Sequence, residues 1–247
     1  AYALTAWIML AALVGGTFIF CAALFRRVFG TRRSVGMCAA ALVCVIATQT
    51  PVSPVQGFYW YNGAVYYTFF YGLALAALAL GIRHALDGGV RRAVPQTLLA
   101  VFIGRGNYVT ALSTAIIGVS VLAILAIMRD KRAKRLIIPV AALIAALVVS
   151  VAAPGNAVRQ AQFADTPGAF EAIFMSFGFA ARCVVQWFRL PAVGMLVLLA
   201  ALLWRAARTA KFEFRCPVLV TAWSYCLMSA MFCPPIYAMG DGGELRL

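Results

Sequence analysis

The chain has 247 residues, of which 64% are hydrophobic and 11% charged, whereas about a quarter of the residues in soluble domains are charged. This composition excludes an ordinary soluble protein and predicts an all-α, polytopic transmembrane helical bundle. The net charge of +14 would suggest a nucleic-acid partner in a soluble chain. Here the Lys and Arg residues lie in short clusters between apolar segments, so we expect membrane lipid as a partner and no nucleic acid.

Eight apolar segments are long enough, or nearly so, to cross a bilayer as helices, which takes about 20 residues. The fourth is the weakest, because Pro95 suits a helix start but "RGN" at 105–107 interrupts the apolar run. It is a short span, a re-entrant half-helix or a broken helix that continues into the fifth. We expect a single transmembrane domain over residues 1–247, as an internal piece of a longer protein. In chain order the segments are 3–25, 35–51, 64–82, 93–108, 109–128, 136–153, 187–204 and 217–233.

The basic residues divide cleanly between alternate connections. Sixteen of the 21 follow the first, third, fifth and seventh segments, and the other five, Arg105, Arg159, Arg182, Arg189 and Arg246, fall on the opposite side. Cytoplasmic loops carry the excess of Lys and Arg, so we expect both termini on the exoplasmic face of the membrane. The chemically varied segments then share that face. The sixteen are Arg26, Arg27, Arg32, Arg33, Arg83, Arg91, Arg92, Arg129, Lys131, Arg132, Lys134, Arg135, Arg205, Arg208, Lys211 and Arg215.

The first of these outer segments is "GFYWYNGAVYYTFFYG", residues 57–72, at the mouth of the third span. An aromatic belt is expected at a membrane boundary and explains part of it. A belt requires neither Asn62 nor the flanking glycines, however, and Pro51 and Pro54 stiffen the preceding loop. We therefore expect Tyr59, Trp60, Tyr61 and Asn62 to face a saccharide or its lipid carrier. The later aromatics, Tyr66, Tyr67, Phe69, Phe70 and Tyr71, are expected to pack or to line the interface.

The segment "GRGNY" places Arg105, Asn107 and Tyr108 near the outer end of the short fourth span. A charge at that depth is expensive unless it meets a counterion or a water-filled cavity. Arg105 is thus a candidate to bind phosphate or a carboxylate, with Asn107 beside it as a further candidate. The alternative is an Arg at headgroup level that pairs with an acidic residue of another outer loop.

In "APGNAVR", Asn156 can cap a helix and Arg159 lies three residues later on the same face. A helix N-terminus beside an Arg suits phosphate, which makes both residues candidates for substrate binding. The alternative is a capped interfacial segment whose Arg159 reaches toward lipid headgroups. Residues 169–182 then show apolar side chains at helical spacing, which predicts an amphipathic helix in the interface plane. Such a helix either holds a lipid-linked substrate or merely connects two spans.

Residues for catalysis are scarce on the expected outer face. Its acidic residues are Asp165, Glu171, Asp241 and Glu244, without a DxD motif or paired carboxylates. Seven scattered cysteines and a single histidine, His84, indicate neither disulfides nor a metal site, and we expect His84 to be solvated or to face headgroups. No Walker, GxSxG or HExxH motif occurs, which argues against an ATPase, a serine hydrolase and a metalloprotease.

The motifs "GFYWYNGAVYYT", "GNYVTAL" and "APGNAVR", in that order between apolar spans, resemble a family of uncharacterised bacterial polytopic membrane proteins described as glucosyltransferase-like. That family is grouped loosely with the GT-C glycosyltransferases, and the likeness covers roughly residues 50–247. The resemblance implies a multi-pass protein of the bacterial inner membrane with an outward-facing site. It also implies a polyprenyl-phosphate-linked sugar as donor and an early outer-loop Asp or Glu as base or metal ligand. This chain has no acidic residue before Asp87, so its catalytic residues stay unassigned.

On that resemblance, Arg105 and Arg159 hold the donor phosphate, residues 59–62 line the sugar site, and a hexosyl group is transferred in cell-envelope glycan modification. A non-enzymatic flippase or accessory binder of lipid-linked saccharide is the alternative, and an envelope glycan polymerase or ligase is a third class. No cofactor is indicated, and a divalent metal is left open.

Overall fold

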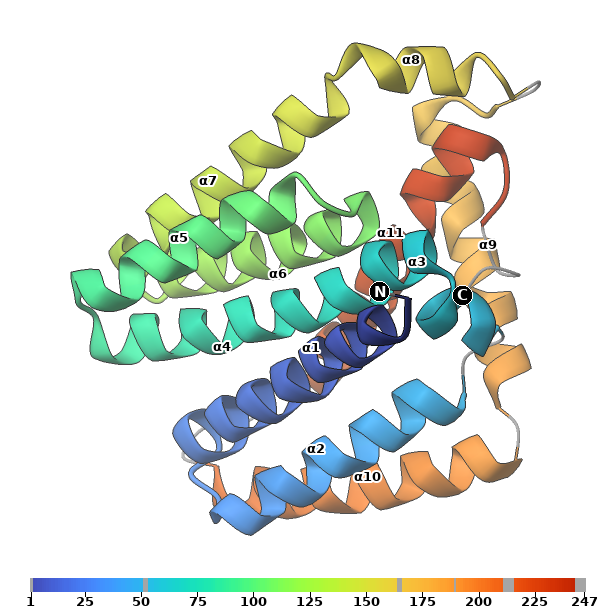
Figure 1. The fold of residues 1–247 in the computed structure, drawn as a ribbon. Helices are drawn as coiled ribbons and strands as arrows, with labels where there is room; N and C mark the ends of the chain where they lie inside the picture. The colour runs from blue at the N-terminus through green and yellow to red at the C-terminus, as the bar shows by residue number, and fades with distance from the viewer. Residues whose placement is uncertain (1, 51–52, 164–165, 189, 211–215, 243–247) are drawn as a thin grey trace.

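The computed structural model describes residues 2–50, 53–163, 166–188, 190–210 and 216–242, and every regular element in these ranges is helical. Candidate site positions Asp165 and Glu244 lie outside them, as do the basic residues Arg189, Lys211, Arg215 and Arg246. Figure 1 shows the helices assembled side by side, as expected for an all-α transmembrane bundle.

The first half of the chain supplies four of the bundle helices and an irregular helical segment. They are α1 (Tyr2–Ala23), extended by the π-helical turn η1 (Leu24–Val28); α2 (Arg33–Gln49); the segment η2 (Val55–Tyr59), α3 (Tyr61–Gly63) and η3 (Ala64–Phe69), which runs into α4 (Phe70–Asp87); and α5 (Val90–Gly104). The second half supplies α6 (Tyr108–Ile127), α7 (Ala133–Val151), α8 (Pro154–Gln160), α9 (Ala169–Trp187), α10 (Leu190–Thr209) and α11 (Pro217–Met239).

Each of the eight predicted spans corresponds to one helix. Seven helices in the described ranges are apolar and long enough to cross a membrane: the α1, α4, α6, α7, α9, α10 and α11 segments. The α2 helix has 17 residues and α5 has 15, so α5 reaches about 22 Å against a hydrocarbon core of about 30 Å. The fourth segment is therefore a short helix of its own that ends at Gly104. Pro95 lies inside α5 and does not start it, because the helix already begins at Val90.

The predicted amphipathic helix of the long outer loop is α9. Its buried face, which includes Ala172, Phe179 and Cys183, packs against Phe232 and Ile236 of α11. On the other side Phe170 and Phe174 are exposed. Figure 1 shows α9 running crosswise to α2, α4 and α10 at one end of the bundle. By length and hydropathy α9 is also one of the helices that could cross a membrane.

Small residues allow the closest packing in the bundle. Gly16 of α1 lies against Gly72 of α4, and a Cβ added to Gly16 would overlap the carbonyl oxygen of Gly72. In the same way Gly104 of α5 lies against Ala146 and the Leu143 carbonyl of α7. Small residues let membrane helices approach closely and pack by van der Waals contact. This packing matters because, within lipid, the hydrophobic effect does not favour helix association.

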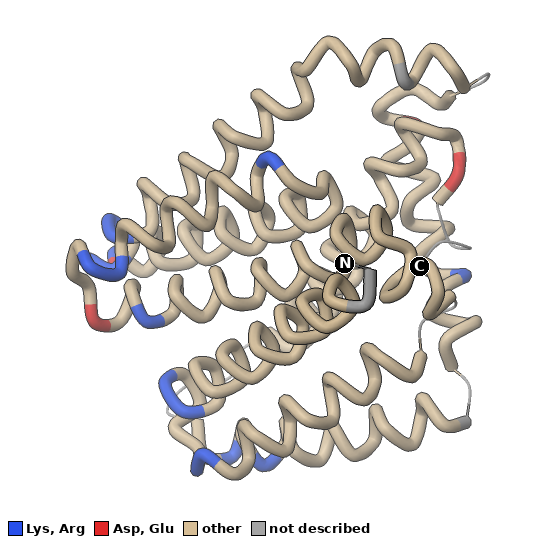
Figure 2. The backbone as a smooth tube through the Cα atoms, in the orientation of Figure 1, with Lys and Arg blue, Asp and Glu red and all other residues tan. Residues whose placement is uncertain are grey.

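The charged residues separate the two ends of the bundle. Figure 2 shows most of the Lys and Arg residues at the end where α1, α4 and α10 finish and α2, α5 and α7 begin. We call this the basic end. At the other end, which we call the aromatic end, lie residues 55–63, 104–108, 152–160 and 240–242. The alternation expected from the sequence is thus present as two chemically distinct ends.

Candidate functional site

The aromatic end is built on an irregular helical segment, residues 55–69. The η2 and η3 turns are π-helical, and Trp60 between them has an extended backbone with a ψ of 116°. The Thr68 hydroxyl donates a hydrogen bond to the carbonyl of Gly57, which ties η3 back to η2. Wide π-helical turns are rare and occur frequently at functional sites, because they re-aim side chains within a helix.

The four residues expected to face a saccharide are all exposed. Tyr59 is 69% exposed, Trp60 and Tyr61 are each 49% exposed, and Asn62 also lies at the surface. Among the later aromatics, Tyr66 and Tyr71 are exposed as well, whereas Phe70 is buried. Exposed and buried positions are both compatible with the prediction that these later rings pack or line the interface. The exposed residues offer both aromatic faces and polar tips, the combination that sugar rings use.

The loop with Arg105 is joined to the aromatic segment through Phe70. A Cβ on Gly106 would overlap the Phe70 ring, so only glycine fits between them. The same ring stacks on Phe102 of α5 at a centroid distance of 5.4 Å. These contacts fix the end of α5 against the start of α4. Arg105 itself lies exposed at the C-terminus of α5 and forms no ion pair within the described part of the chain.

Asn107 has a structural role. Its side chain is only 3% exposed, and its Oδ1 accepts a hydrogen bond from the backbone N–H of Thr110 at 2.9 Å. This is the N-cap of α6, which satisfies one of the amides that the first helical turn leaves unpaired. The expectation that Asn107 binds substrate therefore receives no support from its position, since the side chain is buried and already paired.

Asn156 also stabilises the fold, but differently from the prediction. It does not cap the helix that follows: it lies inside α8, and its Nδ2 donates to the carbonyls of Ser150 and Val151 at the end of α7. Its Oδ1 accepts from the Tyr108 hydroxyl at 2.9 Å, and that hydroxyl also lies 3.2 Å from the Ser150 carbonyl. The structure thus brings two of the predicted motifs, "GRGNY" and "APGNAVR", into direct contact.

Arg159 lies in α8, and its side chain is outside the described part of the structure. The neighbouring Gln160 donates from Nε2 to the Tyr237 carbonyl of α11 at 3.2 Å, which joins α8 to the end of α11. Of the four acidic residues expected on this face, Glu171 in α9 and Asp241 after α11 are described, and both are exposed. No cluster of three His, Cys, Asp or Glu side chains suited to a metal ion occurs among the described residues.

The prediction for His84 was wrong. Its ring is 5% exposed, lies inside α4, and approaches the Oε1 of Gln96 of α5 with its Nδ1 at 2.7 Å. Gln96 is buried too, and Gly81 makes room for it, since a Cβ there would lie 3.0 Å from Nε2. A loop position was expected because His84 follows Arg83, but α4 continues to Asp87 and turns the ring toward α5. The pair satisfies two buried polar groups between the helices.

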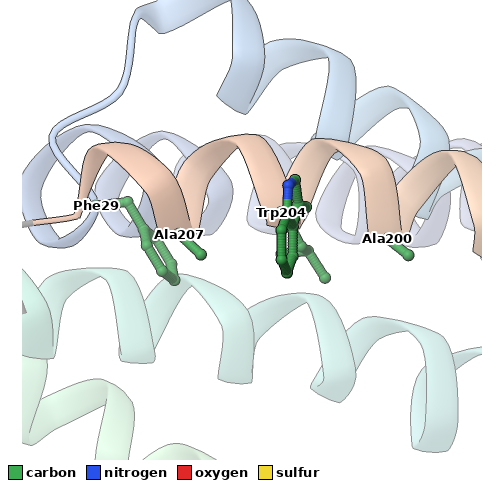
Figure 3. Close-up of a pocket in the computed structure, with 5 residues that line it drawn as sticks. Phe29, Ala200, Trp204 and Ala207 are labelled. Atoms are coloured by element: carbon green, nitrogen blue, oxygen red, sulfur yellow. The ribbon is translucent and has the colours of Figure 1, made fainter. Parts of the chain in front are cut away.

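Sequence reasoning missed a charged pocket at the basic end, where Asp87 meets several arginines. The signal was present, because Asp87 is the single acidic residue among Arg83, Arg91 and Arg92 in one predicted loop. A second hollow, of about 370 Å³, lies between Phe29 and α10 and is lined by Ala200, Leu203, Trp204 and Ala207 (Figure 3). Its lining is apolar, so it offers no group for chemistry and suits the lipid side of the bundle.

Among the described residues, the aromatic end therefore presents the exposed Arg105, a cluster of exposed aromatic rings, and the exposed carboxylates of Glu171 and Asp241. This arrangement is suited to binding an anionic, hydroxyl-rich group beside a membrane. Comparison of the chain with family models, with curated proteins and with solved structures gives no match.

Proposed function

We propose that this protein is a glycosyltransferase-like membrane protein that binds a polyprenyl-phosphate-linked sugar at its aromatic end for cell-envelope glycan modification. The observation that supports this most is the joining of Arg105 to the aromatic segment through the contact of Gly106 with Phe70. One phosphate-binding group and one sugar-binding surface are thereby presented at the same end of a transmembrane bundle.

Arg105 is the group for the phosphate. Its guanidinium is exposed at the end of a short helix and is without an ion-pair partner in the described ranges. A planar guanidinium donates two parallel hydrogen bonds to phosphate oxygens, a geometry that Lys cannot reproduce. The short reach of α5 sets this charge below the ends of its longer neighbours, where an anionic partner lowers its cost.

Tyr59, Trp60 and Tyr61 are the surface for the sugar. Aromatic rings stack on the apolar faces of hexoses, while hydroxyl and indole N–H groups bind their hydroxyls. The π-helical turns on either side of Trp60 aim these residues outward from a segment that is otherwise packed against α1 and α4. The bilayer beside the bundle accommodates the prenyl chain, so the protein has to recognise only the phosphate and the sugar.

Transfer would follow as a direct displacement. An acceptor hydroxyl attacks the anomeric carbon, the bond from that carbon to the phosphate oxygen breaks with its electron pair leaving on the phosphate, and a carboxylate takes the hydroxyl proton. Glu171 and Asp241 are the described carboxylates available at this end. Because the acidic residues expected on this face form no DxD motif or paired carboxylates, a non-enzymatic binder or flippase of the same lipid-linked sugar is the second candidate.

Binding is tested with the purified chain in nanodiscs of zwitterionic lipid and a polyprenyl-phosphate glucose as probe. We expect Arg105→Gln to weaken binding about tenfold, as the loss of a charge-assisted hydrogen bond predicts. Arg182→Gln is the matched control, because Arg182 is exposed in α9 and lies over the Phe179 ring. The proposal fails if Arg105→Gln binds the probe as the unchanged protein does.

A second measurement separates the two candidates. Radiolabelled donor is incubated with envelope membranes containing the protein, its Glu171→Gln variant or its Asp241→Asn variant. The enzyme is supported if the unchanged protein transfers label to glycan and at least one of the two variants does not. Binding without transfer, in the unchanged protein and both variants, supports the binder or flippase.

A further inference from the structure

A pocket of about 310 Å³ opens at the basic end, remote from the aromatic end. Three elements form it: the end of α1 with η1, the end of α4 and the first turn of α5. Four arginines and one carboxylate supply almost all of its polar lining. The lining residues are Ala22, Ala23, Arg26, Arg27, Arg83, Asp87 and Arg92.

Asp87 positions two of the arginines. Its Oδ2 lies 3.0 Å from Nη2 of Arg27 and 3.3 Å from Nη2 of Arg92. The turn between α4 and α5 makes this possible, because Gly88 and Gly89 adopt φ values of 70° and 93° that favour glycine. Arg92 also donates from Nη1 to the Gly88 carbonyl at 2.9 Å, which fixes its guanidinium across that turn.

The other two arginines of the pocket are left without such a partner. Neither Arg26 nor Arg83 forms an ion pair in the described part of the chain. Four positive charges therefore face one negative charge around a single hollow. Ala22 and Ala23 border the hollow, and their small side chains leave room between the guanidinium groups. Like charges held together in this way are stabilised by an anion bound among them.

We propose that this pocket is a binding site for a phosphate group, carried either by an anionic lipid headgroup or by a soluble phosphate compound. Guanidinium groups match phosphate oxygens in geometry and charge, and basic pockets between membrane helices bind phosphorylated headgroups. A role in membrane orientation requires only that the charges lie on one side of the bilayer. Arg32 and Arg33, at the start of α2, serve that role at the same end without lining the pocket.

The test compares two double variants of the full chain that lose the same charge at the same end. Arg26→Gln with Arg83→Gln removes the unpaired arginines of the pocket, and Arg32→Gln with Arg33→Gln is the control. Each protein is titrated in neutral-lipid nanodiscs with inorganic phosphate, and in detergent with phosphatidylglycerol, while thermal stability and retained ligand are measured. A further double variant, Arg26→Lys with Arg83→Lys, keeps the charge. It is expected to fold even if the glutamine variant does not, and then provides the comparison.

We expect the Arg26/Arg83 glutamine variant to lose at least about tenfold in affinity, the lysine variant to lose less, and the Arg32/Arg33 variant to bind as the unchanged protein does. Binding of phosphatidylglycerol alone assigns the pocket to a lipid headgroup, and binding of inorganic phosphate as well assigns it to a soluble compound. Binding of neither probe, or equal losses in both glutamine variants, overturns the proposal. These results are independent of Arg105 and of sugar binding.

Discussion

The hydroxyl of Tyr108 donates a hydrogen bond to Oδ1 of Asn156 at 2.9 Å and so joins the first residue of α6 to the segment that follows α7. Asn156 in turn binds the last carbonyls of α7 with its Nδ2. The three helices α6, α7 and α8 are thereby connected at the aromatic end by one polar network. Its geometry sets where α8, and with it the backbone of Arg159, lies relative to Arg105.

Removing this hydroxyl tests the network. Tyr108→Phe keeps the ring and removes the hydrogen bonds to Asn156 and Ser150, so we expect thermal unfolding in detergent to show a loss of about 1 kcal/mol. Tyr59→Phe is the control, because Tyr59 is exposed and no hydrogen bond ties its hydroxyl to a described residue. Equal stability of the two variants would mean that the network contributes nothing.

The contact of Gly16 with Gly72 leads to a prediction with a neighbouring control. Gly16→Ala places a methyl group against the Gly72 carbonyl, so α1 and α4 must separate, and we expect a loss of about 1–3 kcal/mol. Gly15→Ala meets nothing within 4 Å and improves helix propensity, so it should leave stability unchanged or slightly higher. The measurement is thermal unfolding of both variants in the same detergent. Similar destabilisation by both would contradict the packing of α1 on α4.

Much of this fold could be predicted from the sequence, because a membrane imposes strong constraints on it. Apolar length identifies most of the spans, and the helix observed for each predicted span starts and ends within six residues of it. Helix ends differ because caps and interhelical contacts decide them. The helix that begins at Val90 passes through Pro95, and α4 continues past Arg83 to Asp87. Packing against α5, with His84 bonded to Gln96, outweighs the charge that predicted a loop.

The candidate site was less predictable, for a physical reason. Asn107 was chosen because it lies beside Arg105, and Asn156 because it was expected to cap a helix whose N-terminus lies beside Arg159. In the structure Asn107 caps α6, and Asn156 binds the last carbonyls of α7. Whether an amide binds a ligand or a backbone depends on where the next helix lies, which local spacing does not specify. The contact of Asp87 with Arg27 could not be predicted from the sequence either, since 60 residues separate the two.

The buried pair of His84 and Gln96 should be sensitive to loss of either partner. Gln96→Leu leaves the His84 ring nitrogen without its partner in an apolar setting, so we expect a loss of about 1–3 kcal/mol in thermal unfolding. Gln186→Leu is the matched substitution at an exposed position of α9 and should have little effect. The double variant His84→Leu with Gln96→Leu removes both polar groups, and we expect it to recover part of the lost stability. A double variant as unstable as the sum of the single ones would argue against a direct pair.

The separation of basic and aromatic ends predicts how the bundle lies in its membrane. Cytoplasmic loops hold the excess of Lys and Arg, so the basic end should face the cytoplasm and the aromatic end the outside. Lys131, between α6 and α7 at the basic end, and Asn62, in α3 at the aromatic end, are exposed and provide the probes. In a variant without the seven native cysteines, Asn62→Cys should react with a membrane-impermeant maleimide added to intact cells, whereas Lys131→Cys should react only after the cells are lysed. The reverse pattern would place Arg105 on the cytoplasmic side and remove the basis for an exoplasmic sugar site.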